Sequence, residues 1–293
     1  MSSWCKLSIL TDEVSQDLAE ALRFAQEFKL DGVELRGLNG KAFKDLSLAE
    51  VREVRKRCDA AGLAVSGAAT PVFKCQLDEP AQIADHVEIF KRSVEAADAL
   101  GCQVIRVFAF LRRTHPATSS DLERAASHFP RLLDIVRGSS LIVGLENEAS
   151  CVVATGGETS EFLSHLPVTP ALGVVWDPCN VIYLDDVPDP VAEEFPKVAD
   201  RVVHVHVKDA KRNGTKAAKE CVELGAGDID FPGQLAALKA RGYHGWITLE
   251  THWRGATVLD PEVQHLPAGY SFSANAEPAS RICMGHLQQM VGA

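Results

Sequence analysis

Four side chains of types that bind metals stand on four successive β-type runs in the second half of the chain. Glu146 ends LIVGLE, Asp177 ends ALGVVWD, His206 lies in RVVHVHVKDA, and Glu250 ends GWITLE. The first three are about one strand–helix unit apart, so in a parallel sheet they meet at the carboxyl edge. Three carboxylates that converge in a low-dielectric interior repel one another unless a cation neutralises them. This pattern predicts a divalent metal site.

The identity of the ion stays open at this point. Three oxygen ligands and one imidazole suit Mn²⁺, Mg²⁺, Co²⁺ or Zn²⁺, and ligand chemistry alone does not choose between them. A single acid at a strand end more often caps the next helix. Because four ligand types occur together and include a histidine, we expect one divalent metal ion as the cofactor.

The run Arg201–Ala210 alternates in a way that predicts a polar cavity. Side chains alternate across a strand, so Val202, His204, His206 and Lys208 share one face and the remaining valines the other. A buried parallel strand is normally apolar on both faces. We therefore expect the histidine face to line the inside of the fold.

Short β-type runs alternate with amphipathic helical stretches along the whole chain. The predicted strands are 6–10, 32–38, 63–69, 102–110, 141–148, 171–177, 201–210 and 245–250. The predicted helices are 18–28, 47–61, 80–100, 121–137, 158–166, 191–198, 230–241 and 278–290. Eight such units in about 250 residues are typical of an α/β fold, a single (β/α)8 TIM barrel. A doubly wound sheet is the alternative, and no GxGxxG follows the first strand to favour it.

No linker divides the chain, so residues 1–293 are expected to form a single domain. The segment 254–277 after the eighth strand is too long for an ordinary loop and is rich in Pro, Gly and Ser. We interpret it as a lid or a subunit contact. If it is a subunit contact, we expect a homodimer.

Composition narrows the class of partner. The formal net charge of −10 argues against a nonspecific grip on nucleic acid or on an anionic membrane. The eight cysteines form no CxxC pair, which favours reduced thiols in the cytoplasm. The first residues lack an export signal, and no apolar run has the about 20 residues that a membrane span needs. We expect a cytoplasmic protein that binds a small molecule, with no nucleic-acid and no membrane partner.

Several motifs together resemble one known family. TDEVSQD follows the first strand, GLENE, WDPCN, HVHVKDA and ITLETHW lie at strands five to eight, and GAGDIDF follows strand seven. Nearly the whole chain is similar to the sugar phosphate isomerase/epimerase family of the xylose-isomerase-like (endonuclease-IV-like) TIM barrel superfamily. The resemblance implies that Glu146, Asp177, His206 and Glu250 bind one divalent metal, with Glu146 and Glu250 as the acid/base pair. The chain departs from the family at Asn180, where related enzymes commonly carry a histidine.

The resemblance and the ligand chemistry lead to an enzyme of carbohydrate metabolism. The expected reaction is isomerisation or epimerisation of a ketose or related hydroxy-carbonyl sugar, through a metal-stabilised enediolate. A dehydratase of the keto-inositol or dehydroshikimate type could use the same site. An endonuclease-IV-like repair nuclease would need histidines at strands three and four, where ATPVFKC and RVFAFLRR contain none. A metal-binding barrel without activity is the remaining alternative.

Further polar residues at or beyond the strand ends are candidates for substrate binding. They are Asn180, Lys208, His252, Arg106, Arg36 and Lys74. Lys208 continues the face of His206, and His252 continues that of Glu250. Surface ion pairing is the simpler expectation for the two arginines and Lys74.

Overall fold

A computed structural model describes residues 4–212, 214, 216–218, 220–255, 273 and 275–292. Eight parallel strands form one sheet in the order β1 (Lys6–Ile9), β12 (Trp246–Leu249), β9 (Val202–Val207), β8 (Leu172–Trp176), β7 (Ile142–Glu146), β6 (Val104–Val107), β5 (Ala64–Ala69) and β2 (Gly32–Leu35). A parallel bridge between Leu10 and Glu34 brings the first and last strands together. The sheet is therefore a nearly closed barrel, and the predicted (β/α)8 fold is confirmed.

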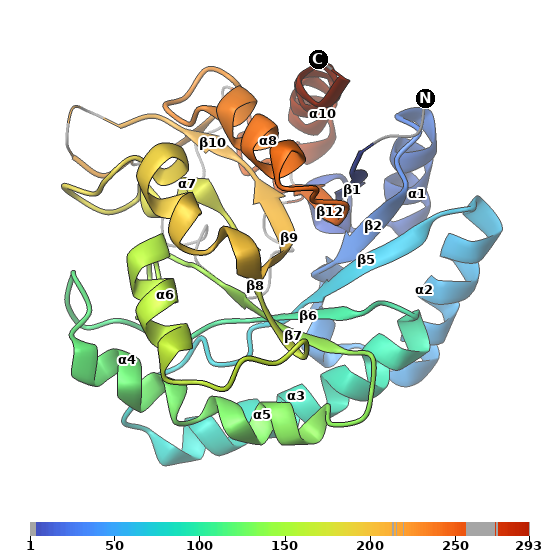
Figure 1. Ribbon diagram of the computed structural model, residues 1–293. Helices are drawn as coiled ribbons and strands as arrows, with labels where there is room; N and C mark the ends of the chain where they lie inside the picture. Colours follow the sequence, from blue (N-terminus) through green and yellow to red (C-terminus); the bar gives the residue numbers. More distant parts are fainter. Residues whose placement is uncertain are drawn as a thin grey trace.

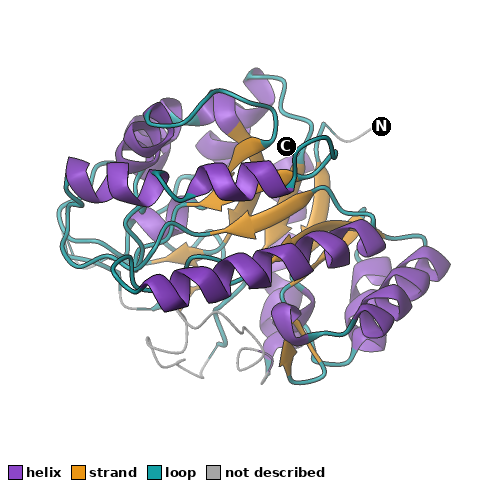
Figure 2. Ribbon diagram, turned by 90° about the horizontal axis from the view of Figure 1, so that it is seen from below, coloured by secondary structure: helices purple, strands orange, loops and turns teal. Residues whose placement is uncertain are grey.

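The helices lie outside the strands. They are α1 (Leu18–Glu27), α2 (Leu48–Ala61), α3 (Pro80–Leu100), α4 (Ser119–Ala126), α5 (Phe129–Ile135), α6 (Gly156–Ser164), α7 (Pro178–Val181), α8 (Phe231–Ala240) and α10 (Ala276–Gly292). Figure 1 shows them as a ring around the strands, and Figure 2 shows the same arrangement from below. Among the described residues, no helix is both long enough and apolar enough to cross a membrane.

Local sequence explains where the helices begin and end. Ser47 and Glu50 form a reciprocal capping box at the start of α2. Gly62 and Gly101 end α2 and α3 with φ values of 70° and 68°, which a residue with a Cβ adopts only at a cost. These helix ends agree with the sequence prediction.

Two predicted helices differ from the structure. The stretch 121–137 contains two helices, α4 and α5, because Pro130 has no N–H to continue a helix and lies instead in the first turn of α5. The stretch 191–198 is a π turn over Pro190–Glu194 followed by a 3-10 turn over Phe195–Lys197. Pro196 again removes a donor at this point.

The predicted strands are longer than the observed ones, notably 102–110, which is Val104–Val107 (β6), and in two of them the residues beyond the barrel strand pair elsewhere. The second barrel strand ends at Leu35, and Gly37–Leu38 (β3) pair instead with Lys41–Ala42 (β4). After β9, Asp209–Ala210 (β10) pair with Cys221–Val222 (β11). Both small antiparallel pairs follow the carboxyl end of a barrel strand.

A bulge in β9 changes the face on which one valine lies. Val174 pairs with Val202 but Val175 pairs with His204, so Val203 is an extra residue in this strand. A Cβ on Gly173 would overlap the side chain of Val203. Val203 therefore fills space beside the inward-facing Gly173, and its predicted place on the outer face was wrong.

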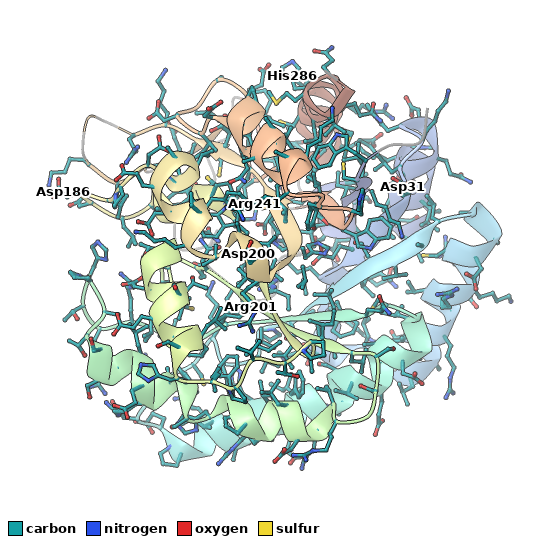
Figure 3. All side chains as sticks on the ribbon, viewed as in Figure 1. Asp31, Asp186, Asp200, Arg201, Arg241 and His286 are labelled. Carbon is teal, nitrogen blue, oxygen red and sulfur yellow. The ribbon has the colours of Figure 1, made fainter. Side chains whose placement is uncertain are left out.

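Polar groups join the elements at the opposite, amino end of the strands (Figure 3). Asp31 accepts a hydrogen bond of 2.8 Å from the Leu7 N–H, and Arg201 donates one of 3.1 Å to the Leu172 carbonyl. On the surface nearby, Arg241 and Asp200 form an ion pair of 2.7 Å. The metal-ligand types lie at the other end of the barrel, as that fold requires of a site.

Candidate metal centre

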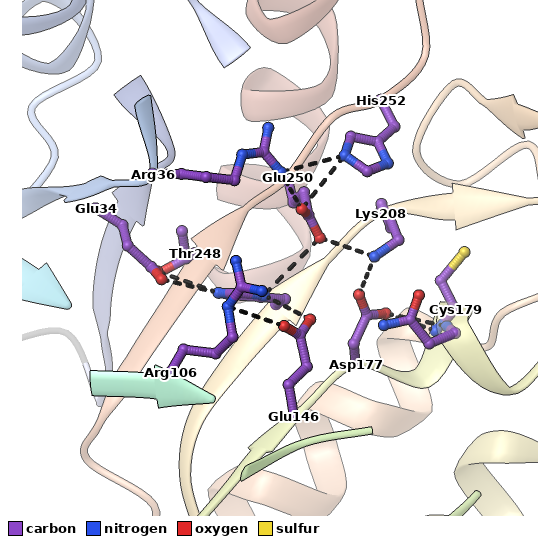
Figure 4. Close-up of polar contacts among 12 residues, drawn as sticks. Glu34, Arg36, Arg106, Glu146, Asp177, Cys179, Lys208, Thr248, Glu250 and His252 are labelled. Atoms are coloured by element: carbon purple, nitrogen blue, oxygen red, sulfur yellow. Dashed lines mark hydrogen bonds and ion pairs between the residues drawn. The ribbon is translucent and has the colours of Figure 1, made fainter. Parts of the chain in front are cut away.

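The four predicted ligands converge at the carboxyl ends of their strands. One ligand atom from each of Glu146, Asp177, His206 and Glu250 lies within 4.8 Å of the other three, and all four residues are buried. Figure 4 shows the three carboxylates turned toward one another from β7, β8 and β12. The alternation of side chains on these strands therefore predicted the shared face correctly.

Asp177 serves two purposes at once. One oxygen, Oδ1, caps α7 by accepting hydrogen bonds of 2.8 Å from Cys179 N and 3.3 Å from Asn180 N. The other, Oδ2, faces the cluster and contacts Lys208. Burial raises the pKa of Asp177 to about 6, although Lys208 opposes the shift. Helix capping thus leaves one oxygen of this carboxylate for the cluster.

His206 presents its two nitrogens to different partners. Nδ1 lies 3.0 Å from Oε1 of Glu146 and 3.8 Å from Oε2 of Glu250. Nε2 lies 3.2 Å from both carboxylate oxygens of Glu34, on the other side of the ring. Burial would lower the pKa of His206, but the charges of Glu34 and Glu146 outweigh burial and raise it well above its usual value. The ring therefore faces the other three candidate ligands with Nδ1.

Lys208 lies inside the cluster. Its ammonium contacts Asp177 and donates a hydrogen bond of 2.8 Å to Oε2 of Glu250 (Figure 4). Burial would lower the pKa of Lys208, but these two carboxylates raise it well above the usual value. Lys208, which was predicted to contact the substrate, thus directly contacts two of the candidate metal ligands.

Arg36 binds three acids and holds Glu250 in place. Its Nε lies 3.0 Å from Asp12, its Nη2 lies 2.6 Å from Glu13, and its Nη1 contacts Oε1 of Glu250. Burial would raise the pKa of Glu250, but Lys208, His252 and Arg36 together hold it well below its usual range. Glu250 is therefore held ionised by its neighbours, Arg36 among them. A substrate contact by Arg36 remains a prediction.

His252 lies on the same side of Glu250. Its Nε2 is 3.3 Å from Oε1 of Glu250 and 3.3 Å from Oε1 of Glu13. Burial would lower the pKa of His252, but Glu250 and Glu13 raise it to about 9. The backbone at His252 has a φ of 48°, a strained conformation of the kind found at functional sites.

The remaining predicted substrate residues lie in different places. Arg106 Nε is 3.2 Å from Oε2 of Glu146, so Arg106 borders the cluster. Lys74 does not contact the four candidate ligands. Its ammonium is 3.5 Å from Glu148 and lies against the ring of Phe108, which Arg106 also contacts. Asn180 uses its side-chain amide to donate a hydrogen bond of 2.8 Å to the Asn147 carbonyl. That bond ties two loops together, and a substrate contact by any of these residues remains a prediction.

The structure adds two residues that the sequence analysis did not single out. Glu34 lies between His204, at 2.8 Å, and His206. It lies in β2, two residues before Arg36, so strand alternation could have placed it on the same face as that candidate. Asn147 donates a hydrogen bond of 2.8 Å to the Asp177 carbonyl and accepts one of 2.9 Å from the Asp177 N–H. Because the Asn147 side chain binds backbone groups of Asp177, no residue type or spacing in the sequence indicates this contact.

The donor set fits a divalent cation. Ligand atoms of three carboxylates and one imidazole lie within 4.8 Å of one another, which is the ligand chemistry of Mn²⁺, Co²⁺ or Zn²⁺ and, with fewer nitrogens, Mg²⁺. Glu34 supplies the carboxylate that ligating histidines commonly have on their other nitrogen. The segment 254–277, predicted as a lid or subunit contact, falls mostly on residues 256–272 and 274, which lie outside the described residues.

Comparison with known proteins finds two similar enzymes. Over 147 residues the chain is 24% identical to inosose dehydratase of Serratia proteamaculans (strain 568), covering 45% of this chain and 48% of that protein. Over 196 residues it is 25% identical to L-ribulose 3-epimerase of Methylomonas sp. (strain DH-1), covering 64% of this chain and 62% of that one. The chain thus spans about half to three fifths of the length of these two enzymes.

Solved structures share the fold over almost the full length. The crystal structure of the IolI protein with a bound zinc atom superposes with a TM-score of 0.73 at 18% identity, covering 98% of both chains. The sequence model of the family described as "Xylose isomerase-like TIM barrel" matches residues 22–275 of this chain. With the barrel and its carboxyl-end cluster, this match shows that the chain belongs to the xylose isomerase-like TIM barrel family.

Proposed function

We propose that the protein is a divalent-metal-dependent isomerase or epimerase of a ketose or a related hydroxy-carbonyl sugar. The observation that carries the proposal is the meeting of Glu146 and Glu250 at one buried centre with Asp177 and His206. Inosose dehydratase and L-ribulose 3-epimerase, to which the chain is similar, both act on polyhydroxylated carbonyl compounds by name. A sugar-like small molecule is accordingly the proposed substrate.

The four cluster residues would hold the metal ion. When bound, the ion would supply the positive charge that polarises a carbonyl and makes the neighbouring C–H more acidic. Mn²⁺ is the first ion to test, because oxygen-rich ligation with a single imidazole suits it.

Glu146 and Glu250 would move the protons. Arg36 and Lys208 keep Glu250 ionised, so this carboxylate can remove a proton from substrate carbon. Glu146 enters from β7, which β8 and β9 separate from β12, and can return a proton from another side. Return to the opposite face of the same carbon gives an epimer. Return to the former carbonyl carbon gives an isomer, and the proton of the neighbouring hydroxyl then moves to the former carbonyl oxygen. Both carboxylates are buried, which limits competition by bulk water.

Exchange of substrate hydrogen for solvent deuterium tests this role directly. Incubation of the Mn²⁺-loaded protein with a panel of ketoses in D₂O is expected to incorporate deuterium at a carbon next to the carbonyl. Glu146→Gln and Glu250→Gln should each reduce that rate by about 10²- to 10⁴-fold. The control is Glu88→Gln, which alters an exposed ion pair with Lys91 on α3 and should leave the rate unchanged. Undiminished exchange in either cluster variant would remove that residue from the mechanism.

A dehydratase is the second candidate, because inosose dehydratase is among the relatives. The same base can remove a proton from the carbon next to a carbonyl. In a dehydratase the proton is not returned to carbon; instead a hydroxyl group leaves the adjacent carbon as water. Product analysis of the deuterium experiment separates the two, since dehydration lowers the product mass by one water. The endonuclease-IV-like alternative predicts cleavage of abasic DNA, which we do not expect.

A further inference from the structure

Two buried cations contact the same aromatic ring beside the candidate metal centre. The guanidinium carbon of Arg106 lies 4.3 Å from the centroid of the Phe108 ring, and the ammonium of Lys74 lies 4.8 Å from it. The Arg106 and Lys74 side chains are only 6% and 7% exposed. Both side chains are therefore mostly buried, side by side on one ring.

These two cations make few hydrogen bonds within the described part of the chain. Lys74 has one ion pair, to Glu148 at 3.5 Å, and Arg106 has one, to Glu146 at 3.2 Å. Neither contact meets hydrogen-bond geometry, so Arg106 Nε is ion-paired to Glu146 but is a buried donor without a hydrogen-bond partner among the described residues. A guanidinium has five N–H donors and an ammonium three, so most of these donors have no hydrogen-bond acceptor among the described residues.

Other buried cations of the barrel differ in this respect. Arg36 donates to Asp12, Glu13 and Glu250. Arg112, with a side chain that is 9% exposed, donates to both oxygens of Glu158 and to the Cys151 carbonyl. A buried charge without hydrogen bonds is costly, and the cost is normally offset by an acceptor. The acceptor that Lys74 and Arg106 need is not supplied by the described residues.

Position and rigidity agree with a ligand at this point. Lys74, Phe108 and Glu148 follow the carboxyl ends of β5, β6 and β7, and Arg106 touches the candidate ligand Glu146. Phe73 precedes Lys74 with a φ of 61° and stacks on Phe110 at 4.6 Å, while its N–H donates to His86. The loop thus presents Lys74 from a strained backbone that aromatic packing fixes.

We propose that Lys74, Arg106 and Phe108 form an anion subsite, and that the substrate carries a carboxylate or phosphate group which binds there. This inference rests on the proposed function and narrows its substrate class from sugars in general to anionic ones. The planar guanidinium and the ammonium would donate charge-assisted hydrogen bonds to the anionic oxygens. Phe108 orients both cations and excludes water, which strengthens their attraction to an anion.

Three unreactive six-carbon polyols test the proposal: D-sorbitol, D-gluconate and D-sorbitol 6-phosphate. They share the acyclic polyol chain and differ mainly in one end group, which is neutral, a carboxylate or a phosphate. Calorimetric titration of the full chain, once with EDTA and once with excess Mn²⁺, is expected to show at least one anion binding about tenfold or more tightly than sorbitol. The tighter anion identifies the end group. Equal affinity for all three compounds, or no binding by either anion, would overturn the proposal.

Substitution locates the preference. Lys74→Met keeps a long side chain but removes the charge, and it should abolish most of the anion preference with and without Mn²⁺. Lys91→Met, at an exposed lysine of α3, is the matched control and should keep the preference. A preference that survives in a folded Lys74→Met chain would assign the anion to another site. If Lys74→Met does not fold, as circular dichroism would show, Arg106→Lys tests the same subsite, because it keeps the charge and loses the planar fork.

Failure of this inference can be told from failure of the proposed function. If the chain binds Mn²⁺ and exchanges substrate hydrogen but shows no anion preference, only the subsite is wrong. If the anion preference is present but Mn²⁺ does not bind, the proposed metal chemistry is wrong and the subsite stands.

Discussion

Glu34 and His206 face each other across the barrel, with both carboxylate oxygens of Glu34 at 3.2 Å from Nε2 of His206. The two residues come from β2 and β9, which are not neighbours in the sheet. Because the Nε2 proton is directed at Glu34, Nδ1 is the nitrogen that would lose its proton and bind when a metal ion enters the cluster. Glu34 thus selects the form of His206 that can act as a ligand.

Replacing Glu34 with Gln should weaken Mn²⁺ binding by about 10- to 100-fold, because the amide no longer fixes the tautomer and orientation of His206. Calorimetric titration of the metal-free protein measures the change. Glu50→Gln, at the start of α2 and far from the cluster, is the control. Mn²⁺ affinity equal to that of the unmodified chain would show that Glu34 does not act through His206.

Glu13 should make the stability of the barrel depend on acid. Burial would raise its pKa, but Arg254, His252 and Arg36 lower it from 4.5 to about 2. Because the folded pKa is depressed, the stabilisation is present above pH 4.5 and is lost as the pH falls toward 2. From pH 7 to pH 4 this group alone accounts for a loss of about 1 kcal/mol.

Glu13→Gln lacks that dependence, so the difference in free energy of unfolding between the two proteins should shrink by about 1 kcal/mol between pH 7 and pH 4. Urea unfolding at both pH values gives the difference. If the gap between the two proteins stays constant over that range, Glu13 titrates alike in the folded and unfolded states.

Two glycines should respond in opposite directions to a methyl group. Gly173→Ala places a Cβ into the side chain of Val203 inside the barrel, and overpacking of this kind costs about 1–3 kcal/mol. Gly285, within α10, has no neighbour within 4 Å of an added Cβ, so Gly285→Ala should stabilise by up to about 1 kcal/mol. Thermal unfolding of both variants tests the pair, and equal effects would contradict the packing around Val203.

The candidate ligands could be predicted because their placement depends on local rules. Strand alternation and the carboxyl-end rule for barrels were enough to bring Glu146, Asp177, His206 and Glu250 together. The bulge that moves Val203 inward was not predictable, since it depends on register with β8 rather than on the residues of β9 alone.

Contacts between residues on opposite sides of the barrel could not be predicted from strand alternation either. Glu34 and His206 are 172 residues apart, and only the closed sheet brings them into contact. The side-chain amide of Asn180 binds the Asn147 carbonyl, a contact that no spacing in the sequence indicates. The turns at 190–197 replace a helix because Pro196 lacks the donor that a regular helix needs there.

The most direct test of the account is a titration of the metal-free chain with Mn²⁺, followed by calorimetry. We expect one ion per chain, with affinity reduced by at least about tenfold in Asp177→Asn and in His206→Gln. Asp200→Asn, at the exposed ion pair with Arg241, should bind as the unmodified protein does. Absence of saturable binding, or unchanged affinity in both cluster variants, would contradict the claim that these four residues hold a metal ion.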